Sequence, residues 1–497
     1  MSVRHFVPLG LGMLGLVLLW LRFPHNYRAS DPWQYALFAR LIAKGIYFKT
    51  FPVPNIFGQR FGVLLPVAAV YALFGMTPST TDLVPLLAGL SILFMIWRVL
   101  PHGAALPGVV CTVTCIPLVW GMTELFPDLI SAAFLLLSVL VLSRRLGSVA
   151  PRVRVLHAGL GVFAWYCAML AKESAWWGLP IWAGSLAVDT LRGRRKVLLW
   201  FHAPAFLFGL LLAAGYLWFS GHFFGDPLLR LHDVQALTGR HQWSIHNPAQ
   251  LRRRLTIGTA LFFWQQYGPV LLLALPGWFV LPAKLRIWAA FSVVTLLLFW
   301  FGSTSLTSYQ PLPLISRMQL SCMPGLCIAA AYFVYWLSCR APRFIGPKLS
   351  LFLLSAVVGL VMAPRLRREV LSWRATPDLE AMALVKAEVR QHRQTRYLII
   401  SAEFRTNDYV AAYLRFTPPA NTSLVYAGEL TAEMLAQADK ALLVIDPRNQ
   451  SDHNDRHKSY AQQIARFGFP RFFQRGNVTV FASEDLTKLL ALRRTRK

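Results

Sequence analysis

Carboxylates are scarce over most of this sequence, so each of them is a candidate for chemistry. Only eight Asp or Glu residues occur before position 365 of the 497 residues. Long apolar runs surround them, and an ionisable group beside a bilayer is costly unless it faces water, pairs with another group or serves a function. The eight are Asp31, Asp82, Glu124, Asp128, Glu173, Asp189, Asp226 and Asp233.

The composition places the chain among membrane proteins. Hydrophobic residues make up 56%, the mean hydropathy is +0.47, and there are 17 Trp and 34 Phe, which is too apolar for a soluble protein of this length. The formal charge of +28 comes mostly from Arg and Lys in short loops between apolar runs. There they set orientation and contact lipid phosphates, which argues against a nucleic-acid partner.

Basic loops give the predicted topology. Four loops, 144–154, 192–196, 284–286 and 340–348, are rich in Arg and Lys and are expected to be cytoplasmic. With a retained first helix at 7–21, this predicts about 11 crossings and an external C-terminus. The apolar segment 61–75 is short for a span, so we interpret it as a re-entrant or surface-lying helix and leave its crossing open. Asp189 is then cytoplasmic, and one outer face carries Asp31, Glu124, Asp128, Glu173, Asp226 and Asp233.

The remaining sequence predicts a second domain. Residues 1–364 form the expected membrane domain, and residues 365–497 form a small soluble α/β domain. Thr376 and Pro377 predict a helix start, with the helix running to about Gln394. Strand-like apolar runs follow at 397–401, 423–426, 441–446 and 478–482. The fold class is therefore a polytopic α-helical membrane protein with a small C-terminal α/β domain.

Four motifs, taken in order, resemble one known family. The first is D-x3-Y-x3-A-R-x4-G, followed by an apolar run that ends in LFG. Next come FPDLISAAFLLLSVLVLSRR, LAKES and SRMQLSCMP. Together they resemble the GT-C glycosyltransferases, which include the protein O-mannosyltransferases and the lipid A aminoarabinose transferases. The residues that carry the resemblance are Asp31, Tyr35, Ala39, Arg40, Gly45, Asp128, Lys172, Glu173, Arg317, Leu320 and Pro324.

The resemblance implies a reaction and its partners. The donor is a sugar on a polyprenyl phosphate, and an acceptor hydroxyl attacks the anomeric carbon with inversion while the lipid phosphate leaves. The acceptor is a glycan, a lipid or a protein, and the reaction takes place on the outer face of a bacterial plasma membrane among its lipids. Asp31 is the expected general base. The alternative for Asp31 is a helix cap before Pro32.

Other residues are expected to bind substrate. Asp128 orients the acceptor, holds Lys172 or binds a divalent cation as in the oligosaccharyltransferase branch; its alternative role is a helix cap after Pro127. Arg317 and Lys172 are expected to bind the leaving phosphate, with snorkelling at the membrane surface as the alternative. The remaining candidates for substrate contact are Tyr35, Arg40, Glu173 and Tyr309.

No metal site and no cofactor is firmly predicted. The histidines between residues 220 and 255 are irregularly spaced, and the cysteines show no pair with metal-ligand spacing. A divalent cation stays open through the resemblance alone.

Two other functions stay open beside the transferase. One is a transporter or flippase for a lipid-linked glycan, and the other is an inactive paralogue that serves as a scaffold. A transporter is expected to show paired broken helices and charges near mid-membrane. Here the acids lie at segment ends and no inverted repeat is apparent, which favours the transferase.

Overall fold

The computed structural model describes most of the first 374 residues and parts of the remainder. The described residues are 6–22, 30–50, 55–147, 150–238, 248–303, 316–340, 346–374, 385, 387–392, 394–401, 422–426, 433, 437–445, 471–475 and 478–483. They divide into two compact units, one of Met1–His25 with Gln34–Val370 and one of Asn26–Trp33 with Leu371–Lys497. The predicted domain boundary at 364/365 stays a prediction.

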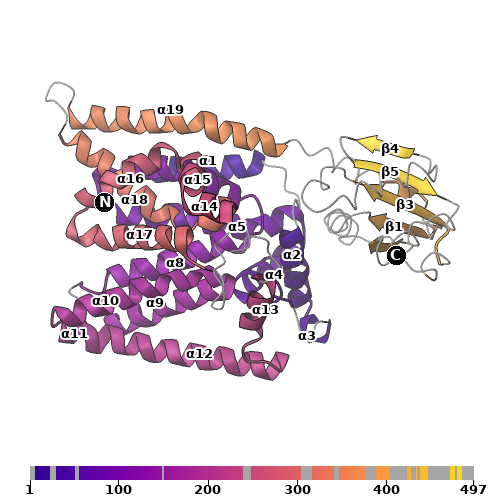
Figure 1. The fold of residues 1–497 in the computed structure, drawn as a ribbon, viewed down its shortest axis with the longest axis horizontal. Coiled ribbons are helices and arrows are strands. Elements are labelled where there is room, and N and C mark those ends of the chain that lie inside the picture. The colour runs from indigo at the N-terminus through magenta and orange to yellow at the C-terminus, as the bar shows by residue number, and fades with distance from the viewer. Residues whose placement is uncertain are drawn as a thin grey trace. The chain divides into compact units, whose positions relative to one another are not determined.

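Apart from residues 30–33 and 371–374, which belong to the second unit, the helices build the first unit (Figure 1). They are α1 (Val7–Arg22), α2 (Ser30–Ala43), α3 (Tyr47–Thr50), α4 (Phe61–Phe74), α5 (Pro78–Val99), η2 (His102–Ala104), α6 (Ala105–Val113), α7 (Ile116–Gly121), α8 (Pro127–Ser143), α9 (Pro151–Ala171), η3 (Glu173–Gly178), α10 (Leu179–Leu191), α11 (Arg195–Val197), η4 (Leu198–His202), α12 (Ala203–Phe224), α13 (Leu229–Thr238), α14 (Pro248–Leu255), α15 (Ile257–Tyr267), α16 (Pro269–Val280), η5 (Ala283–Leu285), α17 (Arg286–Phe301), η6 (Ser316–Gln319), α18 (Met323–Ser338) and α19 (Pro347–Arg374).

The helices have the character of membrane spans. Five described helical segments are long and apolar enough to cross a bilayer, by length and composition: Ser79–Val99, Pro151–Ala171, Arg195–Phe224, Ala283–Phe301 and Pro347–Arg368. Shorter apolar helices accompany them, among them α1, α4 and α8. The chain is therefore helical with membrane character, as predicted. The number of crossings stays a prediction.

Two predicted spans are interrupted. The apolar run at 104–121 divides into α6 and α7 around Thr114 and Cys115. The run at 257–281 divides into α15 and α16 at Gly268, whose φ of +49° lies in the left-handed region that favours glycine. Helix α19 continues to Arg374, past residue 365, near which the soluble tail is predicted to begin.

Helices α8 and α9 lie side by side at the centre of the first unit, and their packing brings two candidate residues together (Figure 1). The Ser131 hydroxyl on α8 donates to the Ala168 carbonyl on α9 at 3.1 Å. The N-terminus of α8 therefore lies beside the C-terminus of α9. Because Asp128 begins one helix and Lys172 follows the other, the packing places these two residues at one end of the pair.

Helix α4 approaches the same end closely. A Cβ atom at Gly62 would lie 2.5 Å from both the Ala171 amide nitrogen and the Cys167 carbonyl oxygen of α9. Those are backbone atoms, which cannot turn aside as a side chain does. The absence of a side chain at Gly62 thus allows the start of α4, and the residue Arg60 before it, to reach the C-terminus of α9.

The second unit contains a five-stranded mixed sheet. Its strands are β1 (Tyr397–Ser401), β2 (Thr422–Tyr426), β3 (Lys440–Ile445), β4 (Arg471–Arg475) and β5 (Val478–Ser483), in the order β2-β1-β3-β5-β4. The pairs of β1 with β2 and β3 are parallel, and those of β5 with β3 and β4 are antiparallel. Strands β1, β2, β3 and β5 lie at the predicted segments, whereas β4 was not predicted. The helix predicted from Thr376 begins outside the described residues, and the α/β class stays a prediction.

Candidate functional site

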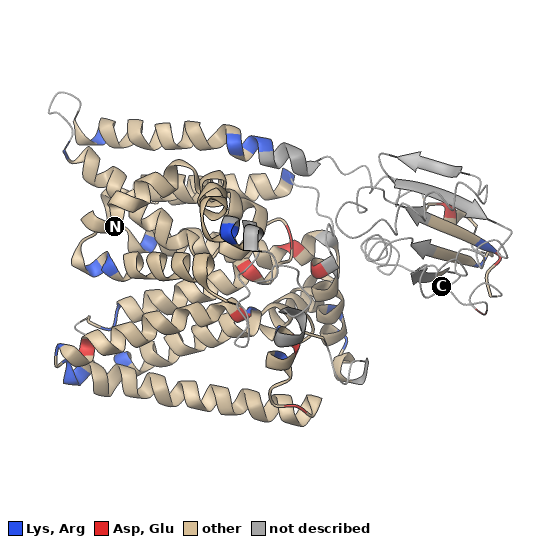
Figure 2. Cartoon of the chain, viewed as in Figure 1, with Lys and Arg blue, Asp and Glu red and all other residues tan. Residues whose placement is uncertain are grey.

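Basic and acidic residues lie near both ends of α8 (Figure 2), where they form ion pairs. The helix has 17 residues and is therefore about 25 Å long. One set, here called the Lys172 cluster, consists of Tyr35, Arg60, Asp128, Lys172, Glu173, Arg230 and Arg317. The other, the Asp189 cluster, consists of Arg145, Asp189, Arg194 and His202.

Lys172 and Asp128 form a buried ion pair. The Lys172 Nζ donates to Asp128 Oδ1, and the two side chains are 9% and 4% exposed. This contact is one of the three roles expected of Asp128. The second carboxylate oxygen, Oδ2, is buried and has no hydrogen-bond partner among the described residues. A buried acceptor without a donor is costly, so Oδ2 is available to a hydroxyl or amine of a bound molecule.

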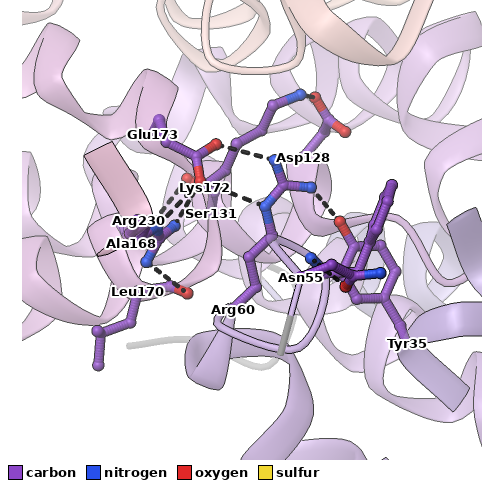
Figure 3. Close-up of polar contacts among 11 residues, drawn as sticks. Tyr35, Asn55, Arg60, Asp128, Ser131, Ala168, Leu170, Lys172, Glu173 and Arg230 are labelled. Atoms are coloured by element: carbon purple, nitrogen blue, oxygen red, sulfur yellow. Dashed lines mark hydrogen bonds and ion pairs between the residues drawn. The ribbon is translucent and has the colours of Figure 1, made fainter. Parts of the chain in front are cut away.

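Glu173 holds two arginines. Its carboxylate accepts from Arg60 Nη2 at 2.9 Å and from Arg230 Nε at 2.9 Å (Figure 3). Arg60 also donates to the Tyr35 hydroxyl, and Arg230 donates to the Leu170 carbonyl at 3.3 Å. Three elements that are distant in the sequence thus meet here, namely the segment before α4, the start of η3, and α13.

Burial and charge shift the pKa values in the Lys172 cluster. Burial lowers the pKa of Lys172 below its ordinary value; Asp128 opposes this, while the positive charges of Arg317 and Arg60 add to it. Burial acts to raise the pKa of Glu173, but Arg60 and Arg230 outweigh it, so that pKa lies below its ordinary value. The pKa of Arg60 is raised, because Glu173 and Tyr35 outweigh burial.

Arg317 belongs to the same electrostatic environment. It lies in η6, and its Cζ is 4.0 Å from the centroid of the Phe126 ring. Burial is the main cause of the lowered pKa of Lys172, and the positive charge of Arg317 acts in the same direction. The cluster therefore holds four basic side chains, those of Arg60, Lys172, Arg230 and Arg317, against the two carboxylates of Asp128 and Glu173. This excess of positive charge suits an anion such as a phosphate.

Arg60 and Arg230 were not predicted as site residues. Arg60 directly precedes an apolar run, where a basic residue reads as a membrane-surface anchor. Arg230 lies in the segment between α12 and α14, in which the histidines were considered as possible metal ligands and the arginine was not considered. The same segment contributes Asp233, which accepts from the buried Gln59 at 2.5 Å. Gln59 thus contacts α13 directly through Asp233. Its neighbour Arg60 is connected to α13 through Glu173, which also binds Arg230.

The other predicted residues are placed as follows. Asp31 lies in the first turn of α2, among the residues Asn26–Trp33 that belong to the second unit. Tyr35 lies one turn later on that helix, is fully buried and joins the cluster through Arg60. Arg40 is five residues beyond Tyr35, roughly 140° around the helix, and therefore on another face. Tyr309 lies outside the described residues.

The described side chains do not fit a metal site built from three ligands. Among the residues that the structure describes, no three His, Cys, Asp or Glu side chains gather closely enough to hold an ion. The two carboxylates of the Lys172 cluster form ion pairs with basic side chains of the protein itself.

The Asp189 cluster is electrostatically satisfied. Asp189 is fully buried and accepts from Arg145 at 2.6 Å, from Arg194 at 2.7 Å and from His202 at 3.0 Å. Both of its oxygens have partners. This cluster ties the ends of α8 and α10 to the start of the long helix that includes α12, so we interpret it as structural.

Comparisons by sequence and by structure gave different results. No protein-family model matches the sequence, and no curated protein matches it. By structure, the chain is similar to ArnT from Cupriavidus metallidurans in the apo state, with a TM-score of 0.64, 11% identity, and coverage of 98% of this chain and 99% of that one. ArnT bound to undecaprenyl phosphate gives a TM-score of 0.54 and 13% identity, with coverage of 98% and 99%.

A second group of similar structures comes from an archaeon. The oligosaccharyltransferase AglB from Archaeoglobus fulgidus, in complex with an inhibitory peptide and a dolichol-phosphate, gives a TM-score of 0.53 and 11% identity, with coverage of 96% of this chain and 74% of that one. ArnT and AglB are both members of the GT-C superfamily. The chain therefore shares its fold with ArnT and AglB, which agrees with the resemblance that the motifs carry.

Proposed function

We propose that this chain is a GT-C-type glycosyltransferase. It moves a sugar from a polyprenyl-phosphate donor to an acceptor hydroxyl on the outer face of the plasma membrane, with inversion at the anomeric carbon. The fold supports a transferase of this class, and the similar structures of ArnT and AglB contain undecaprenyl phosphate and a dolichol-phosphate, respectively. A polyprenyl phosphate is accordingly the proposed lipid partner of this chain.

The observation that carries the proposal is the set of basic side chains in the Lys172 cluster, where Lys172 is buried and three arginines are partly buried. Negative charge develops on the lipid phosphate as the glycosidic bond breaks, and cations already in place stabilise it without reorganisation. Arg317 and Lys172 are the proposed phosphate ligands, and Arg60 and Arg230 add positive charge to the same site. The Asp128 Oδ2 is the proposed acceptor for a hydroxyl group of the substrate.

Asp31 is the proposed general base. It takes the proton of the acceptor hydroxyl as that oxygen attacks the anomeric carbon, and for this it must come within about 3 Å of the hydroxyl. Support comes from the motif that Asp31 begins and that Tyr35 continues one turn later on α2. Tyr35, Arg40, Glu173 and Tyr309 remain proposed substrate contacts.

The decisive experiment combines a transfer assay with a matched pair of variants. Purified protein is incubated with a panel of polyprenyl-phosphate sugars, and release of the polyprenyl phosphate is measured. We expect Lys172→Gln to abolish release. The control is Arg194→Gln, which removes a cation from the Asp189 cluster and is expected to retain release by the folded protein.

A transporter predicts a different result. Proteoliposomes that carry the protein would then move an intact lipid-linked sugar between leaflets with no release of polyprenyl phosphate. That outcome, or the absence of release with every donor of the panel, overturns the proposed function.

A further inference from the structure

Basic side chains outnumber acidic ones at the end of α8 that lies opposite the Lys172 cluster. Residues 144–157 contain four Arg, and residues 189–202 contain three Arg, one Lys and a single carboxylate, that of Asp189. Lys and Arg residues gather at the turn between α10 and α11 (Figure 2). Asp189 already binds Arg145, Arg194 and His202. Within these segments, most of the positive charge is therefore not balanced by a carboxylate.

Contacts bring the two basic segments together. Asp189 links the end of α8, through Arg145, to the start of the long helix, through His202. Helix α9 packs against η4, and Arg154 in its first turn donates from Nη2 to the Gly147 carbonyl at 3.2 Å. We call this end of the first unit the Arg154 surface; its basic residues are Arg144, Arg152, Arg154, Arg192, Arg195 and Lys196.

Two nitrogen atoms of this surface are buried without a partner. Arg154 Nε and His157 Nδ1 have no hydrogen-bond partner among the described residues. The two residues are three positions apart on α9 and so lie on one face of that helix. A buried N–H group without an acceptor is costly, and a phosphate oxygen is an acceptor that suits an arginine fork. An arginine that only faced water would not leave its Nε buried.

Exposed leucines begin directly beside these charges. Arg152, Leu156 and Leu160 are spaced by four residues on α9, so they share one face, and all three are exposed. Leu199 in η4, which packs against α9, is exposed as well. A molecule with an anionic head and apolar chains matches both features, whereas a soluble anion would use only the charges.

We propose that the Arg154 surface binds an anionic phospholipid. Its phosphate accepts from Arg154 Nε, and Arg195 and Lys196 supply further positive charge. Its acyl chains lie along Leu156 and Leu160. Because α8 is about 25 Å long, this lipid lies at the other end of the helix from the Lys172 cluster and is distinct from the polyprenyl donor. The inference is thus independent of the proposed transfer reaction.

The test titrates a fluorescent phosphatidylglycerol into the full-length protein in a non-ionic detergent. We expect saturable binding, and much weaker binding of a phosphatidylcholine with the same chains and label. Arg195→Gln/Lys196→Gln should lower the affinity for phosphatidylglycerol by about 25-fold, since each basic residue beside an anionic headgroup contributes about fivefold. The matched control is Lys284→Gln/Arg286→Gln, which removes two exposed basic residues from another loop and should leave the affinity at the wild-type value.

A second pair of variants tests the geometry at Arg154. Arg154→Lys keeps the charge but loses the guanidinium fork with its Nε–H, and we expect the affinity to fall by about tenfold. Arg152→Lys makes the same exchange at an exposed position two residues earlier and should have little effect. The melting temperature without added lipid shows that both variants are folded.

Four results would overturn the inference. Equal weakening by the two double variants would show that the basic loops attract the lipid diffusely, and equal affinity for phosphatidylcholine would show that charge is not recognised. Displacement of the label by inorganic phosphate, but not by chloride of equal ionic strength, would identify a site for a soluble anion. Loss of phosphatidylglycerol binding in Lys172→Gln would place the lipid in the proposed donor site. The proposed function is tested separately, by release of polyprenyl phosphate.

Discussion

Lys172 and Glu173 are consecutive residues, yet their side chains enter separate ion pairs, Lys172 with Asp128 and Glu173 with Arg60 and Arg230. The backbone explains this division. Lys172 ends α9 with φ −154° and ψ 144°, an extended conformation in which successive side chains point to opposite sides. The extended backbone between α9 and η3 thus lets Lys172 pair with α8 on one side. Glu173 pairs with α13 and with the segment before α4 on the other side.

Glu173→Gln should destabilise the protein at neutral pH and make its stability less sensitive to acid. The folded state holds the pKa of Glu173 below the ordinary value of 4.5, so its carboxylate stabilises the fold fully above that value. This contribution is lost as the pH falls below about 4.5. We expect the difference in apparent melting temperature between wild type and Glu173→Gln to be largest near pH 7 and to shrink toward pH 3.

The control for Glu173 is a carboxylate with more contact to solvent. Asp226 pairs with His232 at 2.8 Å, and the two side chains are 34% and 57% exposed, more than the 23% of Glu173. Solvent screens such a pair, so Asp226→Asn should leave the melting temperature nearly unchanged. A constant gap between wild type and Glu173→Gln from pH 7 to pH 3 would contradict the ionic role of Glu173.

Gly62→Ala should separate α4 from α9. The added Cβ meets two backbone atoms at 2.5 Å, and overpacking of this kind typically costs about 1–3 kcal/mol. Because Arg60 lies two residues before Gly62, donor binding should weaken as well. Gly15→Ala on α1 is the control, since no atom lies within 4 Å of its added Cβ, and alanine in a helix is expected to be neutral or stabilising. Equal melting temperatures for the two variants would refute the close approach.

The topology can be tested at the two ends of the long helical segment Arg195–Phe224. Arg192 precedes this candidate span, Pro227 follows it, and both are exposed. With the exposed Cys339 replaced by serine, Pro227→Cys in whole cells should react with an impermeant maleimide, and Arg192→Cys should react only after lysis. The reverse pattern would place the Lys172 cluster on the cytoplasmic side.

The sequence was sufficient for the class of fold but not for the breaks in its helices. Apolar runs of about 20 residues and the basic loops between them indicated spans, because the bilayer imposes both patterns. The break at Gly268 depends on one left-handed residue within an apolar run, and hydropathy does not register backbone conformation. The continuation of α19 to Arg374 was missed because its last turns are polar. A helix can continue past the point where its sequence becomes polar, as α19 does.

Residues of the candidate site were predicted only where they belong to the sequence motifs. Asp128, Lys172, Glu173 and Arg317 stood in recognisable segments, and the structure brings them together. Arg60 and Arg230 did not stand out, because each resembles any basic residue beside a membrane until tertiary contacts show that both meet Glu173. Arg230 is 57 positions from Glu173 in the sequence, and Arg60 is 113 positions from it. Pairings over such separations have no local sequence signature.

Arg317→Lys should weaken use of the donor while the protein remains folded. Lysine keeps the charge but lacks the planar fork that matches phosphate oxygens and stacks on the ring of Phe126. We expect the apparent KM for a polyprenyl-phosphate sugar to rise by about tenfold. The comparison is Arg340→Lys, which alters an arginine stacked on Trp336 at 3.6 Å and away from the cluster. Unchanged donor affinity and turnover in Arg317→Lys would show that Arg317 is structural or anchors the membrane surface.

Asp31 is the residue on which the proposed mechanism depends most. Two substitutions distinguish its proposed role as general base from the alternative role as helix cap. If Asp31 removes the acceptor proton in the transition state, Asp31→Asn keeps the shape and the hydrogen bonding but loses the base. Transfer should then fall by about 10²–10⁴-fold while donor binding persists, and Asp31→Ala should be no more active. Transfer and undecaprenyl phosphate binding are measured on the same folded sample.

The alternative role expected of Asp31, which lies in the first turn of α2, is a helix cap before Pro32, and a cap predicts the opposite order. Asparagine caps a helix as well as aspartate does, so Asp31→Asn would be nearly silent and Asp31→Ala would cost about 1 kcal/mol of stability. The asparagine variant therefore decides between base and cap. Near-normal transfer by folded Asp31→Asn removes Asp31 from the mechanism and makes Asp128, with its buried Oδ2, the next carboxylate to test as the base.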